Sequence, residues 1–204
     1  MDSSEKVVAN SEERLIREAR KGDVRSFSAL VEAHQEKMIH TACAFLGNME
    51  DAKDAAQEAF VKAHQNLRSF NEKSRFSTWL YRILVNHCKD FLRKKKVRQN
   101  LQSFSDARGE EDTDPVENMR AAGPDARQKL MDKELEAEID KALVGLPFQQ
   151  RSVFTLRYFE GLKLEEIAGI LSLSAGAVKA HLWQANQKMR KILNHHFPAE
   201  GRTS

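Results

Sequence analysis

The stretch Leu164–Leu193 reads LEEIAGILSLSAGAVKAHLWQANQKMRKIL and decides the fold prediction. Its apolar residues recur at spacings of three and four, which predicts a short helix, a tight turn and a longer second helix. The expected interior positions are Ile167, Ala168, Leu171, Leu173 and Val178, with Ala168 as the small residue where two helices approach closely. This is the pattern of a helix-turn-helix, whose second helix enters the major groove of DNA.

The second helix of this motif separates into faces. Val178, Leu182, Ala185, Met189 and Ile192 form a buried stripe, and Lys179, Trp183, Asn186 and Gln187 fall on a neighbouring face with Ala180 and Gln184 beside it. No acidic residue lies between Ala175 and Leu193, which suits a helix flanked by phosphates. Polar and aromatic groups there can reach base edges. The alternative is a solvated basic helix with a half-buried tryptophan.

The composition of the 204 residues is typical of a soluble protein, with 41% hydrophobic and 31% charged residues and a net charge of +3. No apolar run approaches the roughly 20 residues of a membrane span, and no secretion signal is visible, so we expect a cytoplasmic protein. Cys43 and Cys88 stand apart, as expected of core thiols in a reducing compartment. The pattern predicts an all-α fold of two small helical domains, at 10–99 and 127–197, joined by a flexible acidic linker at 100–126.

The first domain carries clear helix boundaries and one acidic face. Asn10 with Glu13 predicts a helix start, Asp23 predicts a second cap, and Gly47 predicts a helix end. In the following helix Asp51, Asp54 and Glu58 share one face, with Gln57 beside them. Because such a face repels nucleic acid, it meets solvent or a basic protein surface, and the residues alone favour solvent.

A basic segment ends the first domain. Lys89–Arg98, KDFLRKKKVR, carries six basic residues and one acid and follows a helix that contains Phe76, Trp79 and Tyr81. Basic residues beside exposed aromatic rings suit single-stranded DNA. The alternative is an ordinary solvated helix end favoured by the helix dipole, and Trp79 lies on the core stripe. No residue pattern suggests catalysis, a bound metal or a cofactor.

Together these pieces resemble a known family. GDVRSFSALVEAH, DAKDAAQEAFVKAHQNLRSF and STWLYRILVNHCKDFLRKKK are similar to the first domain of extracytoplasmic-function (ECF, group 4) sigma factors. LPFQQRSVFTLRYFEGLKLEEIAGILSLSAGAVKAHLWQA resembles their second domain. The resemblance covers about Ala19–Arg98 and Glu134–Leu193, in the order the family shows. It implies an alternative sigma factor, not an enzyme, that binds core RNA polymerase and directs promoter recognition, DNA melting and transcription initiation.

The resemblance also implies which residues make each contact. The face of Asp51, Asp54, Gln57 and Glu58 would grip a coiled coil of core RNA polymerase. Recognition of the −10 element and its melted non-template strand would fall to Arg68, Phe70, Asn71, Arg75, Phe76, Asn86, Lys89 and Arg93. Recognition of the double-stranded −35 element would fall to Lys179, Ala180, Trp183, Gln184, Gln187 and Lys188. The linker would lie on the path of nascent RNA, and an anti-sigma factor is an expected partner.

Two departures from the family pattern bear on promoter choice. Gly176-Ala177-Val178 stands where Gly-Thr-Val is frequent, and Gln184-Ala185-Asn186 stands where Arg-Ala-Arg is frequent. Amides in place of arginines predict weaker or altered −35 recognition. Two other functions remain open: a sigma mimic that titrates an anti-sigma factor, which should lack basic DNA-binding faces, and a stand-alone dimeric regulator, which leaves the first domain unexplained.

Overall fold

The computed structural model describes residues 3–103 and 138–196. The first part contains α1 (Ser3–Arg20), α2 (Val24–Leu46), α3 (Met49–Asn66), the 3₁₀ turn η1 (Leu67–Ser69) and α4 (Phe76–Ser103). The second contains the helical segment 138–144, α6 (Phe148–Tyr158), α7 (Leu164–Leu171) and α8 (Ala175–His196). These ranges contain no strand, so the all-α prediction is confirmed for them. Residues 104–126 of the predicted linker lie outside the described residues.

Local capping fixes most of the helix boundaries. The Asp23 side chain accepts hydrogen bonds from the backbone N–H groups of Arg25 and Ser26 and so begins α2. Gly47 ends α2 in the left-handed region, with φ 73° and its N–H bonded to the carbonyl of Cys43. The predicted start at Asn10 is wrong, because α1 already begins at Ser3. The residues before Asn10 include neither glycine nor proline, so nothing there interrupts the helix.

The helix-turn-helix is formed by α7 and α8. Ser172 turns the chain in the left-handed region, with φ 54°, and the Ser174 hydroxyl accepts from the backbone N–H of Ala177 at 3.1 Å. Ile167 and Val178 are fully buried as predicted, while Leu171 and Leu173 are only partly buried against the same cluster. Ile170 takes the fully buried position at the end of α7. The motif was therefore predicted correctly, except that the buried face of α7 is centred on Ile167 and Ile170 and not on Leu171.

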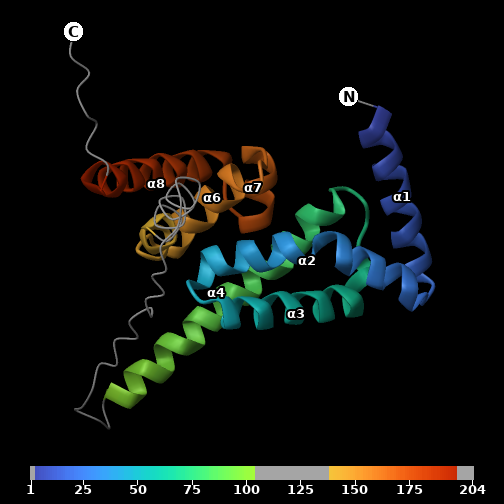
Figure 1. Ribbon diagram of the computed structural model, residues 1–204, viewed down its shortest axis with the longest axis horizontal. Coiled ribbons are helices and arrows are strands. Elements are labelled where there is room, and N and C mark those ends of the chain that lie inside the picture. Colours follow the sequence, from blue (N-terminus) through green and yellow to red (C-terminus); the bar gives the residue numbers. More distant parts are fainter. Residues whose placement is uncertain (1–2, 104–137, 197–204) are drawn as a thin grey trace, which may run out of the picture.

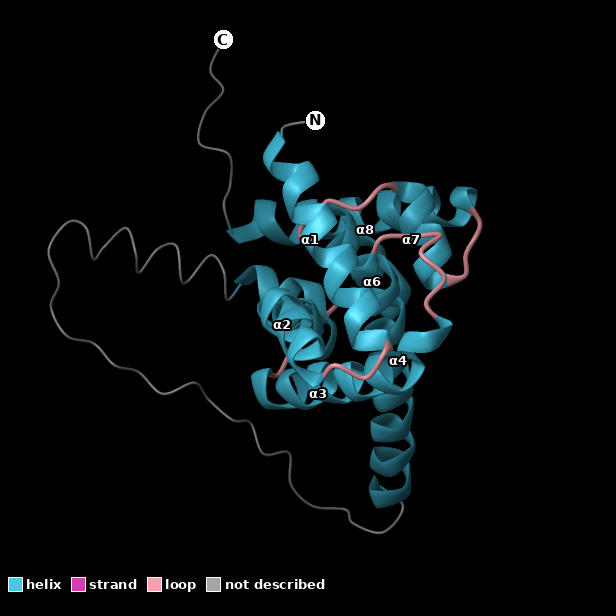
Figure 2. Ribbon diagram, turned by 90° about the vertical axis from the view of Figure 1, so that its right-hand side faces the viewer, coloured by secondary structure: helices cyan, strands magenta, loops and turns pink. Residues whose placement is uncertain are grey.

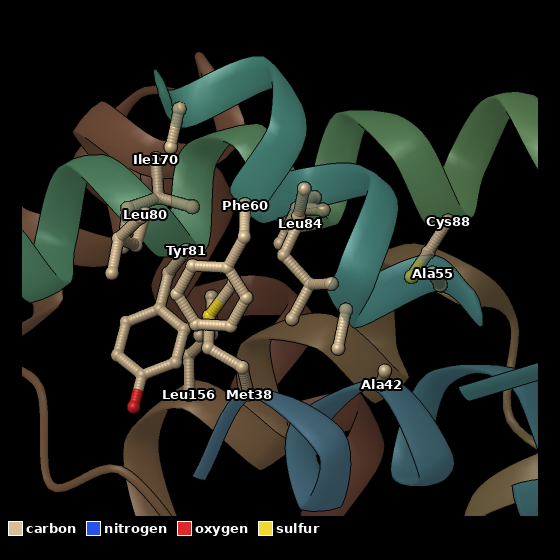
Figure 3. Close-up of a cluster of buried hydrophobic side chains, with 14 of the residues drawn as sticks. Met38, Ala42, Ala55, Phe60, Leu80, Tyr81, Leu84, Cys88, Leu156 and Ile170 are labelled. Carbon is tan, nitrogen blue, oxygen red and sulfur yellow. The ribbon is translucent and has the colours of Figure 1, made fainter. Parts of the chain in front are cut away.

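The two halves of the chain share one hydrophobic core. In Figure 1, α6, α7 and α8 lie together beside α2 and α4. Val153, Leu156, Ile167 and Ile170 of the second half belong to the same buried cluster as the first half. Figure 3 shows Leu156 and Ile170 among first-half side chains such as Met38, Leu80 and Tyr81. The domains are thus packed against one another.

Two polar groups tie the halves together. The carboxylate of Glu160, after α6, accepts hydrogen bonds from the hydroxyls of Thr41 in α2 and Tyr81 in α4. Arg151 is 7% exposed, and its guanidinium donates to the carbonyls of Phe45 at 2.5 Å and Leu146 at 3.0 Å, and also to that of Val144. Phe45 lies in the last turn of α2, Val144 is the last residue of segment 138–144, and Leu146 follows it. Arg151 therefore satisfies helix-end acceptors from both halves.

Candidate nucleic-acid interface

The recognition helix α8 presents the predicted −35 residues to solvent. The exposed set is Lys179, Ala180, Trp183, Gln184, Gln187 and Lys188. Trp183 is 64% exposed, whereas Val178, Ala185 and Met189 behind it are buried. The Gln184 side chain is held at 2.8 Å by the amide of Gln150 from α6, which fixes its orientation. All six residues are therefore accessible from outside the protein.

A second set of exposed residues, from the predicted −10 set, lies on η1, on the loop after it and on α4. Arg68, Asn71, Arg75, Asn86, Lys89 and Arg93 are all exposed. The last part of α4, which carries the basic segment Lys89–Arg98, projects beyond the rest of the bundle in Figures 1 and 2. Asp90 pairs with Arg93 at 3.3 Å, an exposed pair of little energetic weight. This surface of the loop after η1 and of α4 therefore exposes both basic side chains and asparagine amides.

Phe70 and Phe76 differ from the rest of the predicted −10 set. They are 4% and 2% exposed and pack edge-on with ring centroids 5.6 Å apart. Trp79 lies against both rings, with centroids at 5.2 Å and 5.7 Å. Neither ring therefore lies on the exposed surface of this structure, and contact of Phe70 or Phe76 with DNA stays a prediction.

The acidic face of α3 is smaller than the sequence indicated. Asp54, Gln57 and Glu58 are exposed. Asp51 is 28% exposed at its side chain and pairs with Lys95 of α4 at 3.2 Å. Asp51 therefore contacts the basic segment as well as belonging to the acidic face. The two residues are 44 positions apart, so no helical spacing could indicate this pair.

Sequence reasoning also missed Arg20, at the end of α1. Its side chain contacts the segment Leu67–Glu72, which belongs to the predicted −10 loop. The partners lie 47 to 52 residues away in the sequence, so no local pattern could have paired them.

Burial shifts the pKa of two side chains of α4, Tyr81 and Cys88. Burial, together with the Glu160 carboxylate, raises the pKa of Tyr81 well above its usual range. Burial also raises the pKa of the Cys88 thiol to about 12. Within residues 3–103 and 138–196, no three His, Cys, Asp or Glu side chains are grouped to hold a metal ion. None of the described helices is both long and apolar enough to cross a membrane.

Two parts of the chain match models of known protein families. Residues 30–98 match the family model for sigma-70 region 2, and residues 136–189 match that for sigma-70 region 4. The ECF RNA polymerase sigma factor SigW of Bacillus subtilis is 34% identical over 87% of this chain and 94% of the relative. The chain belongs to the ECF sigma factors. The ECF RNA polymerase sigma-E factor of Escherichia coli K12 is 32% identical, over 85% of this chain and 89% of its own length.

Two solved structures share the fold. CnrH, in complex with the cytosolic domain of CnrY, is 25% identical with a TM-score of 0.63, covering 91% of this chain and 98% of CnrH. RpoE, in complex with the anti-sigma factor NepR from Bartonella quintana, has a TM-score of 0.63 at 21% identity, covering 84% of this chain and 98% of RpoE. In this sigma factor the region 2 match spans α2 to α4, and the region 4 match spans the helix-turn-helix.

Proposed function

We propose that this ECF sigma factor binds core RNA polymerase through the exposed face of α3 and reads promoter DNA through two separate surfaces. Asp54, Gln57 and Glu58 form the polymerase contact, with Asp51 at its edge. The supporting observation is that the acidic residues are exposed on α3, while the basic sets are exposed on the loop after η1 and on α4 and α8. Opposite charge on the partners would then direct each surface to its own target.

The −35 contact belongs to α8 and the −10 contact to the loop after η1 and the outer face of α4. Lys179 and Lys188 would neutralise phosphates, while Trp183 and the glutamine amides approach base edges. On the −10 side, Asn71 and Asn86 offer amides, and Arg68, Arg75, Lys89 and Arg93 offer charge for a separated strand. Strand separation would then draw on base capture and polymerase contacts, with no enzymatic step.

The packed domains must separate for both promoter elements to be read at once. The −10 and −35 elements lie about 25 base pairs apart by their names, which is about 85 Å at 3.4 Å per pair. A compact chain of 204 residues has a radius of gyration of only about 17 Å. The 34 residues of 104–137 can span about 110 Å when extended. Opening is therefore geometrically allowed and required.

An anti-sigma factor is a further proposed partner. The supporting observation is that CnrH and RpoE, which share this fold, were solved with the cytosolic domain of CnrY and the anti-sigma factor NepR. A partner that holds the two domains together would keep the −10 and −35 surfaces from acting jointly. We place this activity in the cytoplasm, where the polymerase is found.

Transcription by reconstituted holoenzyme tests the proposal. The purified chain is mixed with bacterial core RNA polymerase and genomic DNA fragments, and new transcript starts are mapped. Lys179→Ala should reduce promoter-specific transcripts about tenfold while the holoenzyme still forms. Asp54→Lys with Glu58→Lys should abolish transcripts and holoenzyme together. A chain that binds an operator tightly without polymerase would support the stand-alone regulator, and one that binds neither DNA nor polymerase would support the sigma mimic.

A further inference from the structure

Arg20, the last residue of α1, contacts the loop that follows α3 through all three nitrogens of its side chain. Its Nε donates to the carbonyl of Leu67 at 3.4 Å, and one terminal nitrogen donates to the carbonyl of Phe70. The other terminal nitrogen pairs with the carboxylate of Glu72. The guanidinium also lies 5.6 Å from the centre of the Phe70 ring. One side chain from α1 therefore contacts three successive parts of the loop.

The loop needs such support at its tip. Glu72 has φ 57°, in the left-handed region that side chains other than glycine rarely adopt. Residues Asn71 to Arg75 are exposed, and within this stretch the Asn71 side chain accepts from the backbone N–H of Lys73 at 3.2 Å. Phe70 anchors the base of the loop in the core. The pair of Arg20 with Glu72 joins the tip of the loop to α1.

We propose that Arg20 is a positioning residue for −10 recognition: it holds the loop 67–75 in the conformation that presents Asn71 and Arg75 to the separated strand. This inference rests on the proposed −10 role of that loop. Arg20 acts through the loop, since its side chain is 26% exposed and three of its nitrogens already donate to loop acceptors. Preorganising the loop removes an ordering cost from DNA binding.

An arginine suits this task better than a lysine. The planar guanidinium presents several N–H donors in a fixed fork, so it can reach two carbonyls and a carboxylate at once. A lysine ammonium is a single point on a flexible stem and would satisfy one of these acceptors at a time. Arg20→Lys should therefore keep the charge and lose most of the positioning.

The test uses the full chain bound to core RNA polymerase. The probe is the short single strand that the unaltered holoenzyme selects from a pool of random sequence. Arg20→Met and Arg20→Lys are compared with Arg17→Met, which removes a charge from an exposed position on the same helix. Strand affinity, its salt dependence, core polymerase affinity and hydrogen exchange of the amides of residues 69–75 are measured.

We expect Arg20→Met to weaken strand binding about 10- to 100-fold, the range for one or two lost charge-assisted hydrogen bonds. Arg20→Lys should recover little, Arg17→Met should stay within about twofold of the unaltered chain, and core affinity should not change. Loop amides should exchange faster in both Arg20 variants, and the salt slope should be unaltered.

Four results would overturn the inference. Equal strand affinity of Arg20→Met and the unaltered holoenzyme would remove the positioning role. A salt slope reduced by about one would make Arg20 a direct phosphate contact instead. Parallel loss of core affinity would make it a general structural residue. Failure of the unaltered holoenzyme to select any strand would remove the −10 role of the loop itself, a failure visible without any variant.

Discussion

Replacing Tyr81 by phenylalanine should loosen the packing of the two sigma domains. Tyr81 is 5% exposed, and its hydroxyl donates to the Glu160 carboxylate across the interface between α4 and the end of α6. Phenylalanine keeps the ring and its burial and removes only this donor. Glu160 would keep its second partner, the Thr41 hydroxyl at 2.5 Å.

The size of the effect follows from the charge of the acceptor. A hydrogen bond to a charged group contributes about 1.5–3 kcal/mol. Because Thr41 still donates to the carboxylate, the lower part of that range applies, about 1.5–2 kcal/mol. At 1.4 kcal/mol for each factor of ten, the ratio of open to packed molecules should rise about 10- to 30-fold.

Single-molecule energy transfer between dyes on exposed residues of α3 and α8 measures this ratio, since it counts rare open molecules directly. The chain offers a matched control in its other tyrosine, Tyr158, which is 53% exposed and contacts Asn186 within the second domain. Tyr158→Phe should leave the open fraction unchanged. If Tyr81→Phe and Tyr158→Phe show the same open fraction, the hydrogen bond from Tyr81 to Glu160 does not hold the domains together.

Three further changes separate local from long-range effects. Gly47→Ala should lower the free energy of unfolding by about 1–2 kcal/mol because of its left-handed backbone, and by more because the new Cβ would lie 2.6 Å from Val144. Gly161 also has a positive φ but has open space around it, so Gly161→Ala should show the backbone cost alone. Urea unfolding measures both. Above pH 9.0 the Cys88 thiol loses its proton in the unfolded chain, whereas the folded one, with a pKa of about 12, keeps it. The free energy of unfolding should therefore fall as the pH rises. Cys88→Ala should reduce this dependence on pH by up to about 1.4 kcal/mol per pH unit. Trp183→Ala should change the free energy of unfolding by no more than about 0.5 kcal/mol, because the ring is 64% exposed. The same change should reduce promoter-specific transcription about tenfold or more. Equal loss of stability and activity would contradict the assignment of Trp183 to DNA binding.

Features set by neighbouring residues were predictable from the sequence. The Asp23 cap, the glycine end of α2 and the turn between α7 and α8 each depend on residues within a few positions of one another. The same holds for the exposed set on α8, because helical periodicity places it opposite the buried Val178 and Ala185. Such features need no knowledge of the tertiary fold.

Features that join distant segments were not predictable. Phe70 and Phe76 were assigned to DNA, but their burial depends on how α2, α4 and the loop meet. The pair of Asp51 with Lys95, and that of Arg20 with Glu72, link residues 44 and 52 positions apart. A charged residue in a sequence shows what it can bind, and only the fold decides whether another part of the chain already binds it.

The proposed contact between α3 and RNA polymerase can be measured as the affinity of the purified chain for bacterial core RNA polymerase. Asp54→Lys with Glu58→Lys is compared with Glu32→Lys with Glu36→Lys, an equal charge change on exposed residues of α2. At about 1.5–3 kcal/mol for each reversed contact, the α3 variant should bind about 100- to 10,000-fold more weakly, and the α2 variant nearly as well as the unaltered chain. Equal affinities for the two variants, or no binding by the folded unaltered chain, would contradict the assignment.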